Sequence, residues 1–75
     1  MKYYVVEIQT NADGTSGNFV FSFSDRSDAD AKYGTLYAAA AKSSVLVHTV
    51  VMLTDRGEML AHKAFVHPVV NHPDE

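Results

Sequence analysis

The sequence predicts a two-layer α+β sandwich with ββαββ order, in which one helix covers one face of a four-stranded, mainly antiparallel sheet. Three observations support this fold class. Two N-terminal segments, separated by a turn-rich loop, contain residues that alternate in polarity as in strands. A central segment repeats apolar residues every three or four positions, as a helix does. A C-terminal segment has the β-branched composition of two further strands around a tight turn. This pattern leaves the order of the strands within the sheet undetermined.

The first two strands are expected over residues 2–10 and 19–24, joined as a hairpin by the loop 11–18, which is dense in Gly, Asn, Asp and Ser. Alternation divides the first strand into two faces, one with Tyr4, Val6 and Ile8 and the other with Tyr3, Val5, Glu7 and Gln9. In the second strand Phe19, Phe21 and Phe23 share one face. We expect these three phenylalanines to belong to the core.

A helix is expected to start near Asp25, with Asp28 completing a capping box that uses a shorter acid. Ser27 with Asp30 is an alternative frame for the same cap. Gly34 lowers helix propensity, and we expect it to mark a close approach of helix to sheet. The apolar stripe that should be buried consists of Ala29, Tyr33, Leu36, Tyr37 and Ala40.

The last two strands are expected over residues 44–53 and 58–67, around a turn at 54–57 with Gly57 in a left-handed bulge position. Both faces of this hairpin are apolar, whereas a strand with one wet face should alternate. One face carries Val45, Val47, Val51, Leu53, Met59, Ala61 and Phe65. The other carries Leu46, His48, Val50, Met52, Leu60, His62, Ala64 and Val66. A short chain can cover only one of them, so we predict that the second set is an interface with another protein chain.

Length and composition agree with an assembling protein. The chain has 75 residues, which is one domain, expected to span 1–67 and to be followed by an extended tail over 68–75. Such a small core is marginal alone, and with no cysteine to form a disulfide, oligomerisation is the remaining way to stabilise it. The net charge of −3 argues against a nucleic-acid partner. We expect no signal peptide, and the longest apolar stretch, 45–53, is too short to cross a membrane.

The histidines are candidates for a metal site. If the turn sets the register, His48 lies opposite Ala64 and Val50 lies opposite His62, which makes the two histidines diagonal neighbours on one face. Zinc requires more protein ligands than these two, so we expect no metal and no cofactor; the alternative that stays open is an ion held between two subunits. Histidines at an interface predict instead that assembly weakens at acidic pH.

No catalytic motif is present. The loop 13–17 contains two glycines and two hydroxyls, but it leads into a strand, whereas a phosphate-binding loop leads into a helix. There is no paired-carboxylate signature and no nucleophile elbow. His67 and His72 are expected to be solvated. We therefore predict a protein that is not an enzyme.

Segments spread over nearly the whole chain carry a resemblance. They are residues 2–10, 12–16, 28–33, 38–41 and 47–48. Together they resemble small uncharacterised proteins encoded in phages and prophages of Firmicutes, whose genes tend to lie with tail or lysis genes. The resemblance implies a virion-associated protein, or an accessory protein in the cytoplasm of the bacterial host. It carries no site residues.

These observations lead to one expected function and two alternatives. We expect a structural or assembly protein that self-associates through the second hairpin face, as a dimer by default. The first alternative is a binding module that inhibits or modulates a host protein, such as a bacterial defence component, through the same face or through loop 11–18. The second is an enzyme or metal protein that uses His48 and His62. No nucleic-acid or membrane partner is expected.

Overall fold

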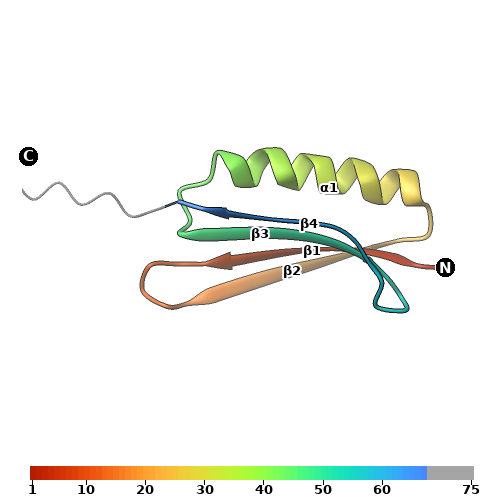
Figure 1. Ribbon diagram of the computed structural model, residues 1–75, viewed down its shortest axis with the longest axis horizontal. Coiled ribbons are helices and arrows are strands. Elements are labelled where there is room, and N and C mark those ends of the chain that lie inside the picture. Colours follow the sequence, from red (N-terminus) through yellow and green to blue (C-terminus); the bar gives the residue numbers. More distant parts are fainter. Residues whose placement is uncertain (68–75) are drawn as a thin grey trace, which may run out of the picture.

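The computed structural model describes residues 1–67 and has the element order ββαββ. The elements are β1 (Tyr3–Thr10), β2 (Ser16–Phe23), α1 (Arg26–Ala41), β3 (Val47–Thr54) and β4 (Met59–Val66). The four strands form one antiparallel sheet in the order β2-β1-β3-β4, and α1 lies across one face of it (Figure 1). The predicted α+β class, with four strands and one helix, is confirmed. The tail predicted for 68–75 lies outside the described residues.

The path of the chain explains the strand order. β1 and β2 pair as a hairpin, and so do β3 and β4. Between the hairpins, α1 carries the chain back over the sheet, and β3 then pairs with β1 rather than with β2 (Figure 1). β1 and β3 are therefore the central strands, while β2 and β4 are the edges.

α1 starts where the sequence predicts. Asp25 is the N-cap, and its Oδ1 accepts hydrogen bonds from the backbone N–H and the hydroxyl of Ser27, both at 3.0 Å. Asp28 lies in the first turn, where negative charge is favoured by the helix dipole. The cap therefore uses the Asp25 frame. The close approach expected at Gly34 is wrong: Gly34 is exposed, and a Cβ added there would meet no atom within 4 Å.

The core lies between α1 and the two central strands. The buried apolar side chains are Ala29, Leu36 and Ala40 from α1, Val5 from β1, and Val50 and Met52 from β3. Phe21 and Phe23 pack against this cluster, as predicted, but Phe19 is 53% exposed. Tyr37 of the predicted helix stripe is also exposed. α1 covers the central strands more fully than it covers the β2 edge.

The β3–β4 turn is also as predicted. Gly57 has φ +81°, and its N–H donates to the carbonyl of Thr54 at 3.0 Å. The first strand pair beyond it is Leu53 with Met59, in the register that the turn predicts.

A bulge then shifts the rest of the hairpin. Met52 pairs with Ala61, so Leu60 is an extra residue in β4. Beyond it His48 lies opposite Phe65, and His62 lies opposite Val51, each one residue away from the predicted partner. Because side chains alternate with a period of two, this shift changes which side chains of β3 and β4 share a face.

Candidate functional site

Half of the predicted interface is covered by α1. His48 is 4% exposed, Val50 0% and Met52 3%, and Leu60 packs against the same core. The carbonyl of Leu46, just before β3, accepts a hydrogen bond from the His67 N–H. The prediction that His48, Val50 and Met52 lie on the outer face of the sheet is therefore wrong. The bulge at Leu60 divides the predicted set between the two faces, and the pairing of Met52 with Val5 of β1 places the β3 members on the helix side.

Three other members of the predicted interface lie on the opposite face. His62, Ala64 and Val66 are exposed on the side of the sheet away from α1. His48 and His62 are therefore separated by the sheet itself and cannot share an ion, which corrects the expected pairing. Within residues 1–67 no group of three or more metal-ligating side chains occurs.

The face of the sheet opposite α1 is the candidate functional site, and we call it the outer face. It is formed by every second residue of the four strands. Its apolar members are Tyr4, Val6, Ile8, Val20, Val47, Val51, Leu53, Met59, Ala64 and Val66. Its polar members are Thr10, Ser16, Asn18, Ser22, Thr49 and His62.

No described element covers the outer face (Figure 1). Four of its large apolar side chains are well exposed: Ile8 at 37%, Val20 at 62%, Met59 at 60% and Val66 at 64%. Near its centre Val6 of β1 pairs with Val51 of β3, and both are half-buried by their neighbours within the sheet. The outer face thus carries apolar side chains from all four strands, with Val20 as the apolar contribution of β2 among Ser16, Asn18 and Ser22.

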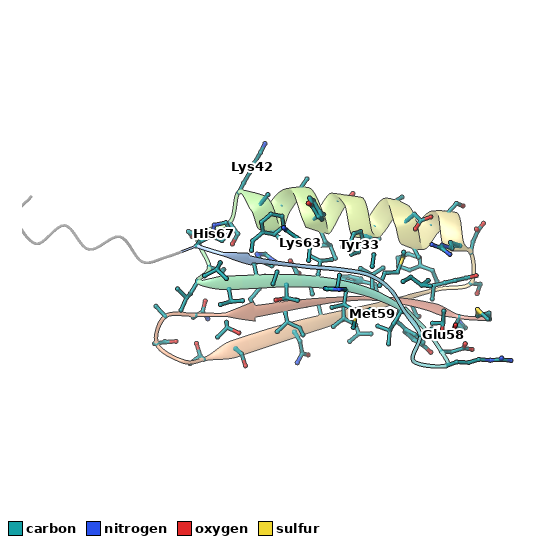
Figure 2. All side chains as sticks on the ribbon, in the orientation of Figure 1. Tyr33, Lys42, Glu58, Met59, Lys63 and His67 are labelled. Carbon is teal, nitrogen blue, oxygen red and sulfur yellow. The ribbon has the colours of Figure 1, made fainter. Side chains whose placement is uncertain are left out.

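The distribution of charge is the reverse of the usual one for an open sheet. Two charged side chains occur within the four strands, Glu7 and Lys63. Both point to the face that carries α1, and Lys63 is visible between the sheet and the helix in Figure 2. An antiparallel sheet normally keeps its apolar residues inside and its polar residues in water. The strands here keep both charges off the outer face.

Glu7 and His48 form a buried pair under α1. The Glu7 Oε2 and the His48 Nε2 are 2.6 Å apart, with side-chain exposures of 11% and 5%. With its proton on Nε2, a neutral imidazole donates to the carboxylate, and its Nδ1 is then an acceptor that has no partner among residues 1–67. Both side chains are buried, and no pocket is present in the described part of the chain. The pair lies in the core under α1.

His67 is not solvated as expected. Its Nε2 lies 2.8 Å from the carbonyl oxygen of Ala40 in the last turn of α1, which also accepts a hydrogen bond from the Ser43 N–H at 3.2 Å. Its ring stacks on Phe65 with centroids 6.2 Å apart, and Figure 2 shows it beside that end of the helix. His67 thus ties the end of β4 to the end of α1. His72 lies outside the described residues.

The β1–β2 loop holds itself together by local hydrogen bonds. The Asp13 Oδ1 accepts from the Thr15 N–H at 2.9 Å and from the Thr15 hydroxyl at 2.6 Å. These bonds favour the carboxylate and lower the pKa of Asp13. Gly14 has φ +90°, which glycine adopts without strain. The loop has the contacts of a hairpin turn.

Sequence reasoning missed the outer-face residues of the first three strands. The signal was present in the first hairpin. Register from the loop places Val20 beside Val6, while the three phenylalanines lie beside Val5 and its neighbours. If the phenylalanines face the helix, then Tyr4, Val6 and Ile8 must face away from it.

Comparison of the chain with protein-family models, with curated proteins and with solved structures finds no match in any of the three. The resemblance to phage-encoded proteins stays a prediction. No helix within residues 1–67 combines the length and the apolar character needed to cross a bilayer.

Proposed function

We propose that this protein is a small non-enzymatic assembly protein whose copies associate through the outer face. The observation that carries the proposal is a sheet face that has exposed apolar residues, no Asp, Glu, Lys or Arg within the four strands, and no described element covering it. Contiguous apolar surface of this kind usually marks an interaction site in a water-soluble chain.

The absence of charged strand residues on the outer face favours a second copy as the occupant. A two-fold contact places the same surface on both sides, so any charge on it meets its like. An outer face without Asp, Glu, Lys or Arg avoids that repulsion. It also offers nothing with which to select a charged partner.

The size of the outer face is sufficient for a dimer. Four strands of eight residues each, spaced by about 4.8 Å with about 3.3 Å per residue, form a rectangle of roughly 19 by 26 Å, or about 500 Å². Two copies together bury about 1,000 Å², which is near the lower limit for a specific interface.

The resulting dimer has four layers. Two sheets pack face to face at about 10 Å, and the two α1 helices lie on the outside. Each sheet is then covered on both faces. The resemblance to phage-encoded proteins supports a role for such a unit in virion assembly, or as an accessory protein in the host cytoplasm.

Charge inserted at the centre of the outer face tests the proposal. Val51→Lys places an ammonium group at the middle of the contact in each copy, and Ala38→Lys adds the same charge on the exposed side of α1. Sedimentation equilibrium should give a dimer or a multiple of it for the parent chain and for Ala38→Lys, and a lower mass for Val51→Lys. Circular dichroism checks that all three are folded.

A parent chain that is monomeric at about 100 μM, well above the concentration at which μM interfaces form, would overturn the proposal. The binding-module alternative, with a host protein on the same face, would then take its place. Equal masses for the parent and a folded Val51→Lys variant would show that copies associate elsewhere on the molecule.

A further inference from the structure

The β2 edge of the sheet lacks the features that normally prevent edge pairing. Proteins protect exposed edges with charges, prolines, bulges or inward-pointing lysines. β4 has two of these, the bulge at Leu60 and the inward-pointing Lys63. β2 has the sequence SGNFVFSF, with no charge and no proline, and it pairs with β1 over eight positions without a bulge. Figure 1 shows β2 along one margin of the sheet.

Two hydrogen bonds define which backbone groups of β2 are free. The Asn11 N–H donates to the Thr15 carbonyl, and the Asp55 N–H donates to the Lys2 carbonyl. In an antiparallel ladder, hydrogen-bonded residue pairs alternate with pairs that are not bonded, and Asn11 with Thr15 is a bonded pair. Counting in steps of two from Thr15, the odd-numbered residues of β2 bond to β1, and the N–H and C=O groups of the even-numbered residues point away from it. The N–H and C=O groups of Asn18, Val20 and Ser22 therefore face the open edge.

We propose that β2 pairs with β2 of a second copy, antiparallel, about a two-fold axis at Val20. Each Val20 then exchanges both backbone hydrogen bonds with Val20 of the other copy. Asn18 lies opposite Ser22 of the other copy, and Phe19 lies opposite its Phe21. The two sheets join into one continuous eight-stranded sheet.

The register is self-complementary in side chains as well as in backbone. Phe19 and Val20 are 53% and 62% exposed, on opposite faces of the same strand, and this single contact covers part of both. Phe19 and Phe21 form two equivalent cross-strand aromatic pairs, a favourable combination in sheets. The other facing residues are uncharged, so no like charges meet.

The edge contact goes beyond the outer-face contact and does not depend on it. One uses backbone groups at a margin of the sheet, and the other uses side chains on a face. Two different two-fold contacts on one chain produce four copies when both form, the number in a D2 tetramer. Such a tetramer is two eight-stranded sheets packed face to face.

Single cysteines test the edge contact cleanly, because the chain has none of its own. Hydrogen-bonded antiparallel partners have Cα atoms about 5.5 Å apart, within the range that a disulfide spans. Mild oxidation of Val20→Cys should give a covalent dimer. Ser22→Cys alone should not, since the two Ser22 positions lie four residues apart along the added strand. A mixture of Asn18→Cys and Ser22→Cys should give the mixed dimer.

Ala38→Cys, on the exposed side of α1, reports the rate of disulfide formation by random collision. The proposal expects Val20→Cys and the mixed pair to cross-link at least tenfold faster than Ala38→Cys. Rates equal to that of Ala38→Cys, or a Ser22→Cys rate equal to that of the mixed pair, would overturn it. The same set repeated in the Val51→Lys background shows whether the edge contact persists when the outer face is blocked, so the two proposals can fail separately.

Discussion

The Nε2 of His48 lies 2.6 Å from the Oε2 of Glu7, and this pair joins the two central strands beneath α1. The pair contributes to the fold by fixing the register of β1 against β3. A shift of β1 against β3 by one residue would turn one partner to the outer face and leave the other charge or imidazole buried alone. We infer that the pair helps to select one alignment between two strands whose apolar residues would accept several.

The first prediction concerns the energy of this pair. Glu7→Leu or His48→Leu alone should each lower the free energy of unfolding by about 3 kcal/mol, because each leaves an uncompensated buried polar group. The double variant should lose much less than the sum, since both partners are replaced by apolar groups of similar size. Urea unfolding at one fixed protein concentration, or in the Val51→Lys background, measures the cycle. Additive losses would show that the two side chains do not act as a pair.

Element order and turn positions could be predicted because they depend on local chemistry. Asp25 caps a helix, and Gly57 adopts a positive φ, whatever the rest of the chain does. Which residues share a face in the second hairpin could not be predicted. Leu60 has no local signal for a bulge, and the one-residue shift leaves an equally apolar pattern on both faces. That this hairpin has apolar residues on a face without a helix was predicted and is seen among residues 1–67, but most residues of that face had to come from the structure.

The second prediction concerns alkaline pH. Burial against the sheet, with a smaller contribution from Tyr37, raises the pKa of Tyr33 above its usual 10.0. The folded state thus holds the phenolic proton more tightly than the unfolded state does. Its contribution to stability is present below about pH 10 and is lost as pH rises beyond it. The melting temperature measured from about pH 8 to 11 should fall less steeply for Tyr33→Phe. Identical slopes for the two proteins would contradict this.

The third prediction concerns the β1–β2 loop. Hydrogen bonds from Thr15 hold the pKa of Asp13 below its usual 3.8. Thr15→Ala removes the hydroxyl bond, which is the largest cause, so the Asp13 pKa should rise toward the ordinary value. An NMR titration of the carboxyl carbon measures both proteins. Since Asp13 is exposed, the melting temperature should change little. No change in the Asp13 pKa would mean that the hydroxyl bond does not form in solution.

The fourth prediction concerns acidic pH and the outer face. Histidine is the side-chain type whose charge changes near neutral pH, and His62 is the histidine of the outer face. In a dimer formed through this face, protonation places one charge from each copy in an apolar contact. The mass by light scattering should therefore fall between pH 7.5 and pH 5.5, and His62→Gln should reduce the fall. An equal fall in His62→Gln would show that His62 does not cause the effect.

Contacts between copies at the outer face test the central claim most directly. A sample that mixes methyl-labelled and unlabelled chains allows isotope-filtered nuclear Overhauser spectra to report contacts between copies alone. The account predicts intermolecular signals at the methyl groups of Val6, Val51 and Leu53, and none at Leu36 under α1. Intermolecular signals confined to α1, or a complete absence of them at concentrations of about 0.5 mM, where even weak μM contacts form, would contradict it.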